Sequence, residues 1–338
     1  MTEETTAGKT RKRRRGCLWA AVVPALLLIT IAGYVAIRAS SCESKAGRDR
    51  GVDEYPDLKE VWSCGSGDTK VVRIPLTGLI MLDEEAGGFL RPAAGSAAEA
   101  LRSIQRATHD TEVRALILEI DSGGGGITAS DIIYEALQEF KDAQDGRKIV
   151  VICGDVVASG AYYIAMASDY IIVHPTTITG SIGVLMESLN VQELAKKIGV
   201  KDVTIKSGKN KDILNPFEDL TPEQRTMLQG LIDDMYDRFV KLVADGRNLS
   251  DEEVRTLADG SVFTASKAVD LGLVDEVGYW QDAMSKVNEL LLTENVKVYR
   301  YEQKFSLTSF LEGLEAWSPL RDMVARSTGT RFMYLWKL

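Results

Sequence analysis

Histidine is scarce in this chain, which has only His109 and His174 among its 338 residues. A Ser-His-Asp triad needs an imidazole placed beside the nucleophilic hydroxyl. His109 lies in the polar stretch RATHDTE, which indicates a helix end or a loop, and His174 precedes Pro175 where a short apolar strand ends. We therefore expect surface or strand-end roles for both, and a histidine-based triad is disfavoured.

Several other signals are missing. The net charge of -9 disfavours nucleic-acid binding, which needs a basic face to neutralise phosphate. Neither GxGxxG nor a GK[ST] ending occurs near the glycine-rich segment, so phosphate binding there is disfavoured. We expect no metal and no cofactor. Cysteine is also rare, and for Cys42 and Cys64 both a disulfide and two unpaired thiols fit the polar, glycine-rich segment around them.

The N-terminal region contains a basic cluster followed by a long apolar run. The run from Cys17 to Ile37 has about 20 uncharged residues, enough for a helix to cross a bilayer core. A cleavable signal peptide usually has a shorter apolar region, so we favour an uncleaved anchor. The preceding basic residues place the N-terminus in the cytoplasm and the rest of the chain outside; they are Arg11, Lys12, Arg13, Arg14 and Arg15.

These patterns divide the chain into five segments. We expect a cytoplasmic tail over 1–15, a transmembrane anchor over 16–38, a polar linker over 39–69, a folded domain over 70–290 and a C-terminal extension over 291–338. The implied location is the inner membrane, with one span and the folded domain on the extracytoplasmic side.

Within the folded domain, stretches with strand and helix character alternate, which predicts an α/β fold with a parallel sheet. Expected strands are 71–76, 113–120, 148–153, 170–173 and 203–206; expected helices are 97–108, 129–143, a stretch opened by Ser159, and 191–198. The C-terminal third is mostly helical, because Thr221 and Ser250 each begin a capping-box pattern.

The last residues, RFMYLWKL, are apolar and follow Gly329. Two interpretations remain open. The segment either packs on the body as a final strand or helix, or lies in a substrate groove as an apolar peptide mimic.

Two glycine-associated features indicate chemistry. Ser159 is followed by Gly160 and opens a helix, where free backbone N–H groups and the positive helix end favour a developing oxyanion. Helix capping is the ordinary role of such a serine. The run Ser122-Gly123-Gly124-Gly125-Gly126 follows a buried strand, and its bare backbone could supply oxyanion donors.

A base for Ser159 has to come from another residue type. Lysines crowd one later segment, at Lys201, Lys206, Lys209 and Lys211. A lysine acts as a base only when it is neutral, so it needs a pKa well below the usual value of about 10.4. Spacing alone does not choose among these four lysines.

Three motifs, in this order, resemble the signal peptide peptidase A family: SGAYYIAMASDYIIVHPTTITGSIGV, IKSGKNKDILNP and LADGSVFTASKAVDLGLVDEVG. The resemblance covers roughly residues 70 to 290. It implies a membrane-anchored Ser-Lys protease with the parallel-sheet, ββα-type core of crotonase and caseinolytic protease. Such enzymes degrade signal peptides after these are released from preproteins.

Carried over by position, the resemblance makes Ser159 the nucleophile, Lys211 the general base and Ser181 the hydroxyl that orients the lysine. Backbone N–H groups of Gly125 and Gly160 would form the oxyanion hole. The chain resembles the short form of the family, whose site is implied to combine a serine and a lysine from neighbouring subunits of a homo-oligomeric ring.

One departure concerns the glycine loop, where the family usually has Asn-Ser-Pro-Gly-Gly and this chain has Gly123 in place of the proline. Without the fixed φ of proline the loop is expected to be more flexible. The change leaves open a non-catalytic, membrane-tethered scaffold of the same fold. A stomatin-associated membrane protease and an acyl-CoA enzyme of the crotonase branch are further alternatives, the latter fitting the span and the Ser-Lys pair poorly.

Overall fold

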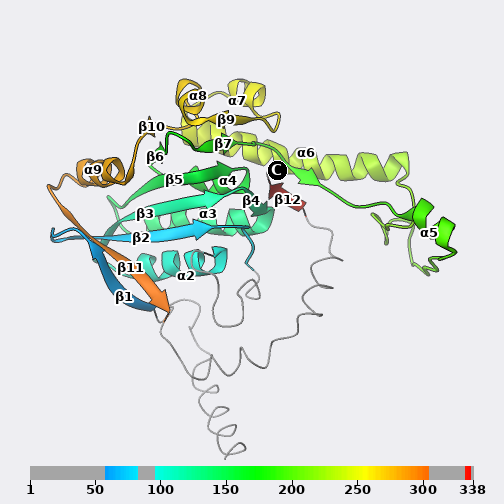
Figure 1. The fold of residues 1–338 in the computed structure, drawn as a ribbon, viewed down its shortest axis with the longest axis horizontal. Helices are drawn as coiled ribbons and strands as arrows, with labels where there is room; N and C mark the ends of the chain where they lie inside the picture. Colours follow the sequence, from blue (N-terminus) through cyan, green and yellow to red (C-terminus); the bar gives the residue numbers. More distant parts are fainter. Residues whose placement is uncertain (1–57, 83–95, 304–331, 336–338) are drawn as a thin grey trace, which may run out of the picture. The chain divides into compact units, whose positions relative to one another are not determined.

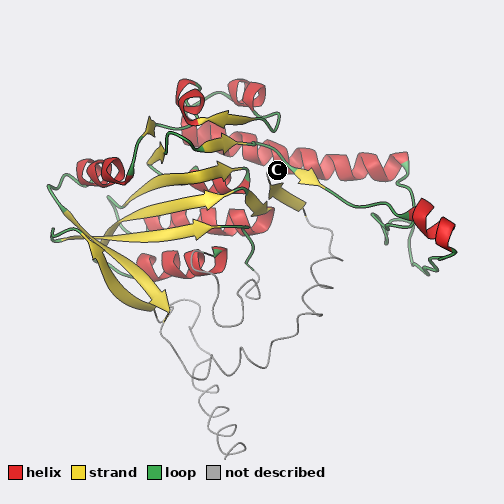
Figure 2. Ribbon diagram, viewed as in Figure 1, coloured by secondary structure: helices red, strands yellow, loops and turns green. Residues whose placement is uncertain are grey.

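The computed structural model describes residues 58–82, 96–303 and 332–335, all within one compact unit, Tyr55–Leu338. Its strands and helices alternate along most of the chain (Figures 1 and 2). The strands are β1 (Leu58–Cys64), β2 (Thr69–Thr77), β3 (Val113–Ser122), β4 (Gly124–Gly126), β5 (Lys148–Ala158), β6 (Tyr170–Val173), β7 (Ile178–Gly180), β8 (Leu185–Met186), β9 (Val262–Thr264), β10 (Glu276–Val277), β11 (Val296–Gln303) and β12 (Phe332–Leu335). The helices are α2 (Ala97–Thr108), α3 (Ile127–Asp142), α4 (Gly160–Ala165), α5 (Gln192–Ile198), α6 (Pro222–Arg247), α7 (Asp251–Leu257), α8 (Ala265–Asp270) and α9 (Trp280–Leu290).

The larger sheet of the described part has the order β1-β11-β2-β3-β5-β6-β10, with β7 and β9 continuing from β5. Its central pairs, β2 with β3, β3 with β5, and β5 with β6, are all parallel. Strand β3 is almost entirely buried, as expected for a central strand covered on both faces. The predicted mixed α/β fold with a mainly parallel sheet is therefore confirmed.

Side chains from alternate positions of β2 and β3 enter two separate apolar cores. Val72 and Leu118 face the larger core, which α2, α3 and α4 share with α6. Val71 and Ile117 face the smaller core beneath α9 and β11. At about 25 cal/mol per Å² of buried apolar area, burial in these two layers stabilises the sheet.

A second, three-stranded antiparallel sheet has the order β4-β12-β8. Strand β4 is the glycine segment that follows β3, and β12 comes from the end of the chain. The apolar C-terminal stretch therefore forms a strand against the body. Both interpretations of this stretch include such contact.

Most predicted elements are present, with some differences. The strand predicted over 203–206 is wrong, because these residues have no regular structure and lie beside no partner strand. Strand β1 falls within the expected linker over 39–69, and β11 lies beyond residue 290 although it pairs with β1 and β2. Both belong to the main sheet.

The predicted tail, anchor and most of the linker lie outside the described residues. Within the described part of the chain, no helix is long and apolar enough to cross a membrane. The capping boxes predicted at Thr221 and Ser250 are both present, and they begin α6 and α7.

Candidate active site

Ser159 lies at the sharp turn between β5 and α4. Its backbone has φ 55° and ψ −119°, a conformation that non-glycine residues rarely adopt. The residue is 1% exposed, and its N–H donates to the carbonyl oxygen of Gly180 at 2.9 Å. The hydroxyl makes no capping hydrogen bond to α4. Ser159 therefore does not cap the helix with its side chain, which is the ordinary role of a serine at a helix start.

Ser181 occupies the equivalent position beyond the neighbouring strand β7. The last residue pair of β5 and β7 is Ala158 with Gly180, so Ser159 and Ser181 both follow directly after it. Ser181 also has a positive φ, 50°, and is buried, and its N–H donates to the carbonyl oxygen of Ser261 at 2.7 Å. The fold therefore brings these two predicted site residues to the same edge of the sheet.

The glycine strand β4 is held in place by the backbone of Ile80. The Ile80 N–H donates to the Gly124 carbonyl oxygen at 3.0 Å, and the Gly126 N–H donates to the Ile80 carbonyl oxygen at 2.9 Å. A Cβ on Gly125 would lie 2.2 Å from that Ile80 oxygen, so only glycine fits there. Since neighbouring residues of a strand point their backbone groups to opposite sides, the Gly125 N–H points away from Ile80.

Ser122 ties the glycine loop to the preceding turn. Its hydroxyl donates to the Gly78 carbonyl oxygen at 2.5 Å and accepts from the Gly124 N–H at 3.0 Å. The sequence interpretation expected Gly123 to make the loop more flexible and did not assign a function to Ser122. In the folded chain, Ser122 and Ile80 anchor the loop on either side of Gly123.

Gly160 begins α4, so its N–H is among those that the helix itself leaves without an acceptor. Strand β4 also lies against α4. The candidate donors of Gly125 and Gly160 are thus presented by two neighbouring elements beside Ser159.

Lys211 is not near Ser159 within this chain. It lies between α5 and α6, in the arm (residues 187–221), and Figure 1 shows α5 beyond the N-terminal end of α6, away from β5 and α4. Its side chain is exposed and makes no ion pair or hydrogen bond within the described residues. Of the predicted site residues, Lys211 alone is separated from the others.

Lys206, another lysine of the arm, is already engaged. It makes ion pairs with Asp212 at 2.8 Å and with Glu218 at 3.4 Å. The hydrogen bond to Asp212, with the nearby charges, raises the pKa of Lys206 above its ordinary value. A lysine held in this way stays protonated and is a poor base, which favours an unpaired lysine such as Lys211 for that role.

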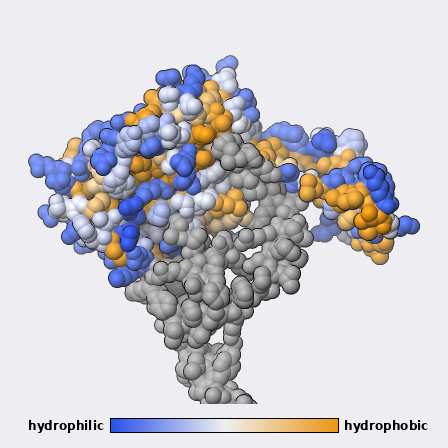
Figure 3. Space-filling view, in the orientation of Figure 1, coloured by the Kyte–Doolittle hydropathy of each residue, from blue (hydrophilic) through white to orange (hydrophobic). Residues whose placement is uncertain are grey.

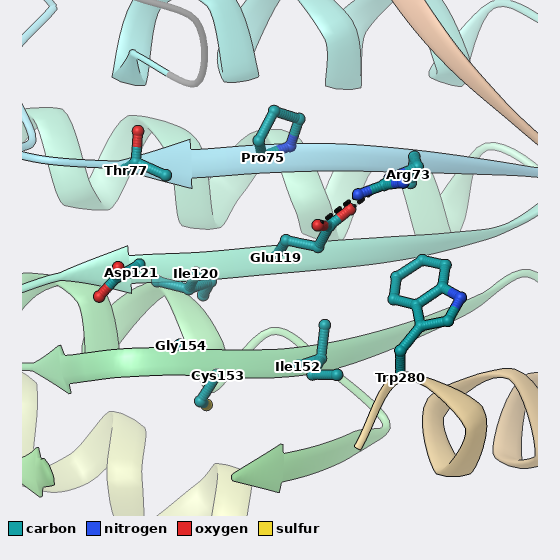
Figure 4. Close-up of a pocket in the computed structure, with 10 residues that line it drawn as sticks. All are labelled: Arg73, Pro75, Thr77, Glu119, Ile120, Asp121, Ile152, Cys153, Gly154 and Trp280. Atoms are coloured by element: carbon teal, nitrogen blue, oxygen red, sulfur yellow. Dashed lines mark hydrogen bonds and ion pairs between the residues drawn. The ribbon is translucent and has the colours of Figure 1, made fainter. Parts of the chain in front are cut away.

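The described histidines and one surface cleft lie outside this group. His109 follows the last residue of α2, and His174 bonds Thr176 and packs against Tyr279. A cleft of about 470 Å³ opens on the sheet face that carries the smaller core, beside Trp280 (Figure 4). Its Arg73–Glu119 pair is bidentate, at 2.5 and 2.6 Å. Ser159 and α4 belong to the opposite face, so this cleft is not the candidate active site.

No group of side chains suited to holding a metal ion occurs among residues 58–82, 96–303 and 332–335. The predicted site residues supply hydroxyls, an amine and backbone N–H groups. Acyl transfer through a serine is what such a set can perform.

Comparisons with known proteins identify the family. Residues 141–294 match the family described as Peptidase family S49. A Synechocystis sp. protein named "Putative protease slr0021" is 40% identical over 214 residues, 63% of this chain and 72% of the relative. An Enterococcus faecium protein named "Putative signal peptide peptidase SppA" is 34% identical over 238 residues, 70% of this chain and 68% of the relative. The chain therefore belongs to peptidase family S49, as a peptidase of the signal peptide peptidase A type.

Proposed function

We propose that this chain is a membrane-anchored serine endopeptidase that uses a Ser159–Lys211 dyad to degrade cleaved signal peptides and other short apolar polypeptides. The observation that carries the proposal is the conformation of Ser159. Ser159 is buried, has a positive φ, and its hydroxyl does not cap α4. It lies beside the glycine strand β4, where the Gly125 N–H points away from Ile80. Strained backbone of this kind persists where function requires it.

The proposed reaction begins when neutral Lys211 takes the proton from the Ser159 hydroxyl. The alkoxide attacks the peptide carbonyl carbon, and the resulting oxyanion accepts hydrogen bonds from the N–H groups of Gly125 and Gly160. The lysine then returns its proton to the leaving amine, which gives an acyl-enzyme that water hydrolyses. Ser181, next to Ser159 at the sheet edge, would orient the lysine.

The proposed dyad calls for a second subunit, because Lys211 lies apart from Ser159 in the single chain. The arm exposes large apolar side chains that a monomer would leave in water, including Val203 at 83% and Ile205 at 98% exposure. Figure 3 shows apolar surface on this segment, at the right of the view. Clustered exposed apolar residues mark association surfaces. We infer a homo-oligomeric ring in which the arm of one subunit carries Lys211 to Ser159 of its neighbour.

The remaining parts of the proposal rest on sequence. The apolar run over 17–37 would anchor the chain in the inner membrane, with the catalytic domain outside. An anchored peptidase of this type meets signal peptides where they are released. The finer fold likeness to crotonase and caseinolytic protease is part of the same proposal.

The test is turnover of a fluorogenic leucine-rich peptide by residues 46–338, with the oligomeric state recorded. We expect Ser159→Ala and Lys211→Ala each to abolish turnover, whereas Lys206→Ala leaves it within a few-fold. The rate should rise with pH, because a general base acts only when unprotonated.

A non-catalytic scaffold is the second candidate, because Lys211 is apart from Ser159 in the single chain. It predicts an assembled oligomer that binds the peptide but never cleaves it. Turnover that survives Ser159→Ala would instead refute the assigned nucleophile.

A further inference from the structure

Three helices meet around the side chain of Tyr163. This residue belongs to α4, the helix that follows Ser159, and it is 0% exposed. Its ring packs against Tyr134 of α3, with ring centroids 5.6 Å apart, and against Phe239 of α6, with ring centroids 5.2 Å apart. One aromatic side chain therefore holds α4 between α3 and α6.

Polar groups join the same three helices. The Tyr163 hydroxyl donates to Asp131 Oδ1 of α3 at 2.6 Å. Arg238 of α6 donates from Nη2 to Asp131 Oδ1 at 2.6 Å and from Nε to the Tyr163 hydroxyl at 3.0 Å. Burial, together with the hydrogen bond to Asp131, raises the pKa of Tyr163, so its hydroxyl keeps the proton that it donates. Arg238 thus has one partner on each of the other two helices.

Arg238 marks the point where α6 leaves the packed body of the protein. Residues that follow it, such as Phe239 and Val240, are buried in the larger core. Among residues 222–237, which the structure describes in full, Leu228 is the one buried residue. Figure 1 shows this N-terminal part of α6 extending towards α5 and the arm.

A long projecting helix magnifies any change at its base. From Arg238 to the start of α6 at Pro222 the helix rises about 24 Å, at about 1.5 Å per residue. A tilt of about 5° at Arg238 therefore moves the start of α6 by about 2 Å, and the arm beyond it moves further. Displacing a reacting group by about 1 Å can cost about 100-fold in rate. The contacts of Arg238 thus bear on where the arm delivers Lys211.

We propose that Arg238 is a positioning residue whose bonds to Asp131 and Tyr163 fix the direction in which α6 carries the arm. Arg238 touches no reacting group and acts through α6. The side chains of Arg238 and Asp131 are 59% and 38% exposed, and exposed ion pairs add little to global stability. The role of the pair is therefore geometric. This inference rests on the proposed function for the task of Lys211, but not for the direction of α6.

A second ion pair on the same helix provides the matched control. Arg255 of α7 donates to Asp237, the residue before Arg238, at 2.8 Å, and both side chains are exposed. This pair joins α6 to α7. Arg238→Gln and Arg255→Gln therefore each remove one exposed ion pair from neighbouring positions of α6, and both variants should keep the melting temperature of the parent.

The direction of α6 is measured in the full chain by double electron–electron resonance. Glu135 of α3 and Glu223 at the start of α6 are exposed, and each is replaced by p-acetylphenylalanine and spin-labelled. Labelled chains are diluted into unlabelled chains, so that only distances within one chain are measured. We expect Arg238→Gln to shift or broaden the distance distribution by at least about 2 Å and Arg255→Gln to leave it as in the parent. An unchanged distribution in Arg238→Gln would overturn the proposal.

Mixed oligomers test whether this direction matters for turnover of a leucine-rich peptide. In a mixture of Ser159→Ala and Lys211→Ala chains, only the Ser159→Ala chain supplies Lys211. We expect Arg238→Gln to lower turnover about tenfold or more when it is placed in that chain, and to leave turnover within a few-fold when it is placed in the Lys211→Ala chain. Arg255→Gln should leave turnover within a few-fold in either chain. An equal loss from both placements of Arg238→Gln would show a general structural role and overturn the proposal.

The two measurements separate this inference from the proposed function. A mixture without Arg238→Gln that shows no turnover would refute the shared site, and the distance distribution would still decide whether Arg238 directs α6. Turnover in that mixture, with no effect of Arg238→Gln in either chain, would refute the positioning role and keep the peptidase.

Discussion

Substituting Gly125 by alanine tests the geometry of the proposed oxyanion hole. The new Cβ would lie 2.2 Å from the Ile80 carbonyl oxygen, whereas real Cβ contacts are essentially never under 3.0 Å. Because the obstacle is backbone, β4 itself has to move by roughly an ångström, which is enough to misplace a donor that must sit within hydrogen-bond distance of the oxyanion. Losing one such donor lowers kcat by about 10²- to 10³-fold.

Gly126→Ala is the matched control, because the nearest atom to its new Cβ is the Met81 Sδ at 3.5 Å, an ordinary contact. We expect kcat of Gly126→Ala within a few-fold of the parent. Both variants should keep the far-UV circular dichroism spectrum and oligomeric mass of the parent, since the main sheet does not depend on β4. The assay is steady-state hydrolysis of a fluorogenic peptide. Equal kcat for Gly125→Ala and the parent would refute the assignment of Gly125.

Three further predictions follow. Ser122→Ala removes a hydroxyl that accepts a hydrogen bond from the Gly124 N–H. We expect kcat to fall about tenfold and the free energy of unfolding, measured in urea, to fall by roughly 1–3 kcal/mol. An unchanged kcat would mean that the loop needs no such anchor. Burial opposes ionisation of Asp110, but its hydrogen bonds with Lys70 and the Glu112 N–H, together with the positive charges of Lys70 and Arg106, outweigh burial and lower the Asp110 pKa. The stability that Asp110 contributes is therefore complete above about pH 4 and is lost as pH falls through the lowered folded-state pKa; urea unfolding from pH 6 to pH 2 should show a smaller decline in Asp110→Asn. Ile205→Asp alters a side chain that is 98% exposed, so it should leave the melting temperature of the single chain unchanged and reduce the oligomeric mass in sedimentation, and an intact oligomer would contradict the role of the arm.

The central strands could be predicted because their local pattern and their environment agree. The stretch VRALILEI is apolar except for Arg114 and Glu119, and it becomes the largely buried strand β3, covered on both faces. Helix α2 spans the predicted residues because Ser96 caps its first turn. In such segments burial reinforces intrinsic preference, so short-range reasoning is sufficient.

Long-range pairing explains what sequence reasoning missed. Strand β1 is polar enough to resemble a linker, and only its pairing with β11 makes it part of the sheet. The stretch 203–206 has strand-forming residues but no partner, so it forms no strand. The role of Ile80 as the support of β4 has no local signal at all, because it depends on backbone groups alone.

The arrangement of the candidate site was predictable only in part for the same reason. Ser159 and Ser181 follow two strands that pair in register, so a parallel sheet is enough to bring them together. The positive φ of Ser159 could not be predicted, because an ordinary helix-capping serine would have the same sequence around it. Lys211 is separated from Ser159 because the arm extends away from the main sheet (Figure 1).

Mixing two inactive variants tests the central claim most directly, since the proposed site takes Ser159 from one subunit and Lys211 from the next. Ser159→Ala and Lys211→Ala chains are unfolded together, refolded as mixed oligomers and assayed against the fluorogenic peptide. The account predicts that each variant alone is inactive and that a 1:1 mixture recovers roughly a quarter of the parental turnover, the share of interfaces with both groups intact. No recovery in mixed oligomers of parental size would contradict a site shared between subunits.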